Sequence, residues 1–577
     1  MLILLLLTVF FTSSLFGFSH LFFKEQRFPA FLVYGTAIVL LLLHIFHFFF
    51  PITWSFSLIL LLIGNIFTFK FVREHWGRKK ILNLFSLTKK WGRDHPISLF
   101  LDFLVLAFGV TFILFVAYTG VFYIDYYDSY LYHIPVVNWI NRQAAIQGFV
   151  LLHSRFGFTN GIFLLSALFN SLARIPITQH SFYATPNVIF AIWLILLSIH
   201  GIIRIIHSLS LRAHSLNSFM SYAIQALSFP IFLVFFERSY VSSLAQETGL
   251  YVFFILSASL AFFSPPISLL AASIGVVLKM SGLFWTLFVS GLIFFQFRKI
   301  GDHRRTILLT FLLIFFWTMR TLFFTGQLLF PISFTTLPFW EKFALSFESK
   351  MAVQASIREW ARYNPYQQRI DSEIQWFFNF FRHTVPFSFW YSLVLFVGNT
   401  IAFLFLMIKK RDFLLKHGLG LLFFLMTASG ISLGLSYYSA PDIRLLWPLF
   451  ALSMVLILVF FVSILYLSFK KRTLFLALSF LLFLVCLYIF PKEKLQKFIE
   501  NPHLDRRLRL VIPTPSLKNQ FAKYTTYPSI PFSFTLSEGD QCGTADLPCL
   551  INATEAATLK FNVSESGAIK SIERMEN

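Results

Sequence analysis

The chain has 577 residues, of which 57% are hydrophobic and 13% charged, with 79 phenylalanines and a formal net charge of +21. A water-soluble fold does not need so much apolar surface, and runs of about 20 apolar residues, each long enough to cross a hydrocarbon core of about 30 Å, recur along the chain. The basic residues fall in short loops between these runs and form no basic domain interleaved with aromatics, so membrane orientation explains them better than nucleic-acid binding.

The first part of the chain alternates apolar runs with one basic loop. The run 1–23 lacks a basic leader and a small-residue cleavage site, which favours a retained helix over a signal peptide. Further runs cover 28–50 and 52–69, and the loop 70–95 then carries eight Lys or Arg against two acids. The positive-inside rule places this loop in the cytoplasm, and therefore the next loop, 123–160, on the outer side.

The stretch from Asp125 to Asn160 places acids, imidazoles and guanidiniums where the apolar run 103–122 ends. Pro135 favours the first turn of a helix, and apolar residues follow at helical spacing. The pattern predicts a short helix lying in the membrane interface, ended by Gly148. The alternative is an ordinary interfacial helix with belt aromatics and solvated charges. The polar face of the predicted helix carries Asn138, Asn141 and Arg142.

Two later runs do not fit a single spanning helix. The run 161–172 is too short to cross and is interpreted as a helix that dips into the membrane. The run 267–297 is too long for one helix and is interrupted at 279–282, which predicts two short antiparallel helices meeting near Lys279. Single membrane helices are expected at 188–203, 216–236, 250–263, 307–324, 387–408, 419–438, 445–469 and 474–490.

Every later basic cluster falls on the cytoplasmic side of this arrangement without adjustment. We therefore predict an all-α integral membrane protein with about 14 membrane segments, some of them short, and with both termini outside. The membrane domain is 1–490, with a long outer loop at 325–386, and residues 491–577 form a polar outer-side tail. Within the long loop, residues 356–362 are helical in character, and Pro365 ends them; this helix is either a cover over a site or a peripheral cap.

Ionisable groups at or inside membrane segments are costly, which makes Asp128, Glu247 and Lys279 the informative charges. Transfer of a sugar from a lipid phosphate needs a carboxylate to accept a proton and cations to stabilise the leaving phosphate. Asp128 would supply the first, and Arg155, Lys279 and Arg444 the second. For Lys279 the alternative is snorkelling to the interface. A divalent cation, Mg²⁺ or Mn²⁺, held by Asp128 and Glu247 is a further alternative.

Several short motifs occur between Tyr127 and Cys549. They are Tyr127-Asp128-Ser-Tyr-Leu-Tyr132-His133, Trp139, His153-Ser-Arg155-Phe-Gly157-Phe, Gly326-Gln-Leu-Leu-Phe-Pro331, Trp360-Ala-Arg362 and Cys542-Gly-Thr-Ala-Asp-Leu-Pro-Cys549. Together they resemble a family of spirochaetal polytopic membrane proteins that supplies no established substrate. The acid after an early membrane helix, followed by Tyr132-His133 and an interfacial helix, also resembles the first outer loop of the GT-C superfamily of polyprenyl-phosphate-dependent glycosyltransferases.

The resemblance implies a GT-C-like fold with Asp128 as the catalytic base. Many GT-C enzymes have two adjacent acids there, whereas here Ser129 follows Asp128 and the second acid is Asp125, so the identity of the base and the use of a metal stay open. The residues expected to bind substrate are Tyr132, His133, His153, Arg155, Lys279, Arg362 and Arg444.

These observations together predict a membrane glycosyltransferase on the outer face of a bacterial inner membrane. Its donor would be a polyprenyl-phosphate sugar, and its acceptor a glycan, a lipid or a protein. One alternative is an enzyme like an O-antigen ligase or polymerase, in which Arg358 and Arg362 do the work. The other is a non-enzymatic transporter of lipid-linked saccharides, which predicts charges along a path at the membrane midplane.

Two of the three cysteines are expected to form a disulfide. Cys486 lies inside an apolar run, whereas Cys542 and Cys549 lie in the polar tail. The predicted topology places this tail in an oxidising compartment, where disulfides form and persist. The alternative is two unpaired thiols.

Overall fold

The computed structural model describes the greater part of the chain. The described residues are 1–25, 27–75, 96–121, 124, 128–173, 182–211, 215–236, 239–295, 303–363, 419–439, 443–468 and, in the tail, 522–525, 534–537, 549–550, 559–564 and 569–574. At some of these positions, among them 358–363, 443–445 and the first three tail segments, only the backbone is described.

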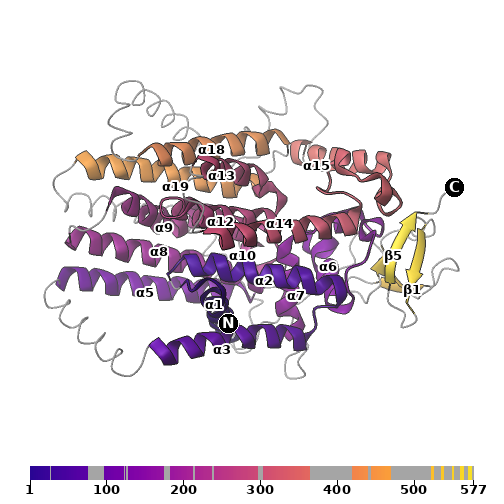
Figure 1. Cartoon of the computed structure of the whole chain (residues 1–577), viewed down its shortest axis with the longest axis horizontal. Helices are drawn as coiled ribbons and strands as arrows, with labels where there is room; N and C mark the ends of the chain where they lie inside the picture. Colours follow the sequence, from indigo (N-terminus) through magenta and orange to yellow (C-terminus); the bar gives the residue numbers. More distant parts are fainter. Residues whose placement is uncertain are drawn as a thin grey trace, which may run out of the picture.

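Within these segments, nine helices are long and apolar enough to cross a membrane. Most of them run alongside one another, whereas α1 is drawn steeply inclined to the rest (Figure 1). The finding confirms a helical, multi-pass membrane protein. The total of about 14 segments stays a prediction, because the runs 387–408 and 474–490 lie outside the described residues. The nine helices are α1 (Leu2–Phe23), α2 (Ala30–Phe49), α3 (Trp54–His75), α5 (Pro96–Thr119), α8 (Thr185–Leu211), α9 (Leu216–Val234), α14 (Arg304–Thr325), α18 (Leu419–Ser439) and α19 (Ile443–Ser468).

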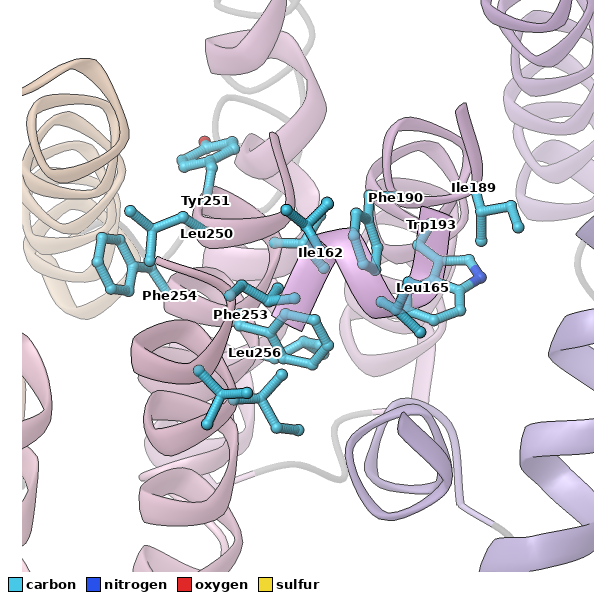
Figure 2. Packing of buried hydrophobic residues seen from close by; sticks show 14 of the residues in the cluster. Ile162, Leu165, Ile189, Phe190, Trp193, Leu250, Tyr251, Phe253, Phe254 and Leu256 are labelled. Atoms are coloured by element: carbon cyan, nitrogen blue, oxygen red, sulfur yellow. The ribbon is translucent and has the colours of Figure 1, made fainter. Parts of the chain in front are cut away.

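Four further apolar helices are too short to span. They are α7 (Gly161–Leu172), α11 (Glu247–Leu260), α12 (Pro265–Leu278) and α13 (Leu283–Phe295). Helices of 12 to 14 residues rise about 18 to 21 Å, well short of a hydrocarbon core. Every residue of α7 and α11 is buried, and Figure 2 shows side chains of α7, α8 and α11 packed together. Helix ends at membrane depth are tolerated when protein covers them, as here.

The ends of the long helices meet in the pairs that the predicted topology requires. At one end of the bundle, the Tyr34 and Thr306 hydroxyls lie 2.7 Å apart and join the starts of α2 and α14. At the other end, the first outer loop meets the end of α2, where Ala145 donates to the His47 carbonyl at 2.8 Å. The same loop meets the end of α14, where Gly148 donates to the Phe323 carbonyl at 3.0 Å. Helix ends assigned to one side by sequence are therefore neighbours.

The interruption predicted at Lys279 is confirmed. Helix α12 ends at Leu278, Lys279 is extended, and the short helix η4 (Met280–Gly282) leads into α13. The two pieces fold back on each other, since the Thr286 hydroxyl of α13 donates to the Ala272 carbonyl of α12 at 2.9 Å. The lysine thus occupies the turn between buried α12 and α13, which is partly exposed.

The helix predicted in the first outer loop exists as α6 (Ile134–Arg142), but its expected surroundings were wrong. Asn138 and Asn141, assigned to a solvated polar face, are 9% and 3% exposed. Asn141 donates to the carbonyls of Ile52 and Ala167, both at 2.9 Å, and the Tyr183 hydroxyl donates to Asn138 at 2.6 Å. Partners distant in sequence satisfy these two asparagines, so most of α6 lies in the protein interior, whereas Arg142 at its end is exposed.

The polar tail contributes β-strands that the sequence patterns did not indicate. Strands β1 (Ala522–Thr525), β2 (Phe534–Ser537) and β3 (Cys549–Leu550) form one sheet, antiparallel between β1 and β2 and parallel between β2 and β3. Strands β4 (Leu559–Val563) and β5 (Ile569–Arg574) form an antiparallel hairpin. The predicted disulfide is untested, because Cys542 lies outside the described residues and only the backbone of Cys549 is described.

The β4–β5 hairpin docks on the first outer loop. Gln147 donates from its backbone to the Lys570 carbonyl at 3.2 Å and accepts from the Ile572 amide at 2.9 Å. The Ile569 amide donates to the Gln143 side chain at 3.2 Å. The tail and the first outer loop therefore lie at the same end of the bundle, where Figure 1 shows β5 beyond α6.

We expect Gly148→Ala to weaken this docking. Gly148 has φ +73°, and a Cβ there would lie 2.2 Å from the Ile572 carbonyl oxygen. Left-handed backbone conformation costs an L-residue about 1–2 kcal/mol, and backbone atoms cannot yield to the clash. Limited proteolysis of the full chain should cut the tail faster in this variant. Gly291→Ala, whose added Cβ meets nothing within 4 Å, is the matched control and should leave the rate of tail cleavage unchanged.

Candidate functional site

A buried ion pair between Glu247 and Lys279 forms the base of the candidate site. Glu247 lies in the first turn of α11, and Lys279 follows α12. The ammonium donates to Oε1 of the carboxylate, and the two side chains are 3% and 12% exposed for Glu247 and Lys279. Oε2 of Glu247 has no hydrogen-bond partner among the described residues. Lys279 therefore does not snorkel to the surface but neutralises a carboxylate inside the protein.

His133 brings the first outer loop against this ion pair. It ends the short helix η1 (Ser129–His133), and its Nε2 lies 3.1 Å from Nε2 of Gln246, the neighbour of Glu247. Its Nδ1 lies 3.4 Å from the Ser129 hydroxyl. Burial, and then the positive charges of Lys279 and Arg155, lower the pKa of His133 well below its usual value. The ring is therefore neutral, and the amide of Gln246 assigns Nε2 as the acceptor.

Arg155 supplies a positive charge near His133. It lies in the short helix η3 (Ser154–Gly157), and its backbone amide donates to Nδ1 of His153 at 3.3 Å. Arg155 forms no ion pair with a residue in the described segments. An alternative role for Arg155 is to pair with Asp125 or Asp128 and fix the loop; the pairing with Asp125 is untested, because Asp125 lies outside the described residues. The charges of Arg155 and Lys279 both act on His133.

We expect His153 to make the protein less stable in mild acid. Burial, and then the charge of Arg155, lower the pKa of His153 to about 4 from its ordinary value of 6.5. The unfolded chain binds this proton first, so stability is complete above about pH 6.5 and falls as the pH drops towards 4. The loss is about 3 kcal/mol. His153→Gln should flatten the melting temperature between pH 6.5 and 4; an unchanged slope would contradict the assignment.

The other predicted site residues are placed to different degrees. Asp128 precedes η1, is partly exposed, and lies four residues before Tyr132, whose ring centroid is 4.3 Å from that of His133. Asp125 lies outside the described residues. Only the backbones of Arg362, in α15 (Phe347–Tyr363), and Arg444, in α19, are described.

The long outer loop lies over the end of the first outer loop. The Gln354 side chain of α15 donates to the Pro331 carbonyl, and the Lys350 ammonium donates to the Thr336 hydroxyl at 3.0 Å. The ring of Phe330 in turn packs against Phe158, with centroids 5.3 Å apart. Phe158 also contacts Tyr132, so the start of the long loop reaches the first outer loop. Whether the helix at 356–362 covers a site or forms a peripheral cap stays open.

The described residues do not assemble a ligand set for the divalent cation considered above. Glu247 already pairs with Lys279 through one oxygen. No group of three or more His, Cys, Asp or Glu side chains with metal-binding geometry occurs in the described segments. A hard cation such as Mg²⁺ prefers several oxygen ligands, so we derive no step through a metal here.

The sequence patterns missed three buried polar residues on two membrane helices: His44 and His47 of α2, and Arg320 of α14. Arg320 is 1% exposed, and the two histidines are 0% and 2% exposed. Each lies within an apolar run that was interpreted only as a span. The signal was present, because an arginine inside a membrane segment is a functional candidate by default.

Comparison with known proteins identifies one relationship. Residues 1–451 match the model of a family described as Domain of unknown function (DUF8201). No curated protein and no solved structure matches the chain.

Proposed function

The chain belongs to the DUF8201 family, and for this member we propose a membrane glycosyltransferase that uses a polyprenyl-phosphate sugar on the outer face of a bacterial inner membrane. The observation that carries the proposal is the meeting of the acidic first loop, through His133 and Gln246, with the Glu247–Lys279 ion pair. Departure of the phosphate requires positive charges, which Arg155 and Lys279 would supply. Removal of the proton requires a carboxylate, which Asp128 of the first outer loop would supply.

In the proposed reaction, Asp128 accepts the proton of the acceptor hydroxyl as its oxygen attacks the anomeric carbon. The bond between that carbon and the donor phosphate oxygen breaks, and its electron pair leaves with the phosphate. Arg155 stabilises the charge that develops there, and Lys279, oriented by Glu247, adds its donors. Neutral His133 contributes hydrogen bonding without a further charge.

Donor turnover in membranes tests the proposal. Membranes that contain the full chain are supplied with radiolabelled polyprenyl-phosphate hexoses, and the release of polyprenyl phosphate is measured against membranes without the protein. We expect release that depends on the protein and on an added cell-envelope extract as acceptor. Donors that stay intact with the whole panel of hexoses and extracts would contradict it.

We expect Arg155→Ala to lower transfer by about 2–4 kcal/mol in transition-state terms, by analogy with removal of an oxyanion donor. Arg155→Lys keeps the charge but loses the planar pair of N–H donors that matches two phosphate oxygens, so it should recover only part of the rate. The measurement is kcat/KM together with the melting temperature. If Arg155 were only structural, the melting temperature would fall in step with the rate; the proposed role expects a folded, inactive protein.

A transporter of lipid-linked saccharides is the second candidate, and the burial of Arg320 inside a membrane helix is the observation that favours it. Vesicles that contain the full chain and a short-chain fluorescent lipid-linked sugar separate the two functions. Transfer consumes the donor, whereas transport moves an intact donor between leaflets.

A further inference from the structure

The guanidinium of Arg320 is buried with its hydrogen-bonding edge unused. The side chain is 1% exposed, and its one hydrogen bond runs from Nη1 to the Thr159 carbonyl at 3.5 Å. Nε and Nη2 have no partner among the described residues. These two nitrogens form the side edge of the guanidinium, whose parallel N–H groups match two oxygens of one oxyanion. The free part of Arg320 is thus the part that recognises oxyanions.

Two histidines accompany this edge. The ring of Phe324 lies 4.6 Å from the Arg320 guanidinium carbon and 6.3 Å from the His47 ring, so it contacts both. His44 lies one turn before His47 on α2, and the charge of Arg320 acts on both rings. Both ring nitrogens of His44 lack partners in the described part of the chain; those of His47 make no hydrogen bond of normal geometry there, although the backbone of Gln143 lies close to that ring.

In the segments that the structure describes, no carboxylate compensates the charge of Arg320. It forms no ion pair with any acid among the described residues. An unpaired ion in a protein interior costs several kcal/mol, and a guanidinium does not escape this cost by losing its proton. Neutral imidazoles can donate hydrogen bonds but carry no negative charge. The arrangement therefore lacks an anion.

We propose that Arg320, His44 and His47 bind a phosphate group, carried either by a lipid or by free inorganic phosphate. The fork supplies two N–H donors, and each neutral imidazole supplies one more. Hydrogen-bond donors around a full positive charge suit an oxyanion with several oxygens. A halide is a single atom and cannot accept both parallel N–H groups of the guanidinium in the same way. The site is separate from the Glu247–Lys279 pair and does not rest on the transfer reaction.

Equilibrium binding to the full chain in detergent tests the proposal and separates the two sources. The probes are ³³P-orthophosphate and ³³P-labelled dihexanoyl phosphatidic acid, each in chloride buffer. We expect saturable binding of one of them at about one per chain. Saturation by orthophosphate identifies free phosphate, and saturation by the lipid alone identifies a headgroup. Absence of saturable binding of both probes to the wild-type protein in this buffer would overturn the site.

Variants assign the binding to the named residues. Arg320→Lys keeps the charge but loses the fork and should weaken binding about tenfold or more. The control is Arg304→Lys, an exposed arginine at the other end of α14, which should bind like the wild type. The double variant His44→Asn/His47→Asn keeps the fork intact and should weaken binding by a smaller factor. Equal affinity in Arg320→Lys and wild type would refute the assignment even if phosphate binds.

Discussion

Asp128→Asn is expected to reduce sugar transfer by about 10²- to 10⁴-fold while the protein stays folded, because asparagine keeps the shape of the side chain and removes the proton acceptor. Asp128 precedes the helix that carries Tyr132 and His133, so the change lies one turn from both rings. The measurement is kcat/KM with a polyprenyl-phosphate sugar, alongside the melting temperature of the purified chain.

Two further variants show whether a loss of sugar transfer in Asp128→Asn is specific to that carboxylate. Glu348→Gln removes an exposed carboxylate from α15 and should leave transfer unchanged. Asp125→Asn should matter less than Asp128→Asn; an equal loss from both would point to a metal shared by the two acids. Full activity in Asp128→Asn would exclude this residue as the base.

The membrane helices could be predicted because their signal is local. A run of apolar residues specifies a span wherever it lies in the chain, and the alternation of basic loops predicts which helix ends share a side of the membrane. The break at Lys279 was equally local, since a charge followed by a glycine interrupts an apolar run that is too long for one helix. These features needed no knowledge of tertiary partners.

The surroundings of α6 could not be predicted, because they depend on distant segments. Asn141 looked solvated, but its partners are carbonyls of Ile52 and Ala167. The meeting of His133 with Gln246 also joins residues more than a hundred positions apart. The sequence could single out Glu247 and Lys279 separately as charges that are unfavourable inside a membrane segment. It could not predict that they pair, because no local pattern links the start of α11 with the end of α12.

Glu247→Gln is expected to destabilise the protein by about 3–5 kcal/mol, because it leaves the Lys279 ammonium buried without its counter-charge. Lys279→Met should destabilise it by a similar amount, since it leaves the carboxylate unpaired. The double variant should recover most of this loss, because replacing a whole buried pair by neutral groups is often close to neutral. The measurement is the free energy of unfolding in detergent for all four proteins.

Transfer measured on the same four proteins also distinguishes a structural role of the Glu247–Lys279 pair from a functional one. If the pair only supports the fold, the double variant regains transfer along with stability. If Lys279 stabilises the departing phosphate, as we propose, the double variant is stable but inactive. The exposed pair of Lys342 and Glu573, 3.3 Å apart, is the control, and its removal should cost no more than about 1 kcal/mol. Losses of Glu247→Gln and Lys279→Met that simply add in the double variant would show that the two charges do not depend on each other, contrary to the pairing on which the site is built.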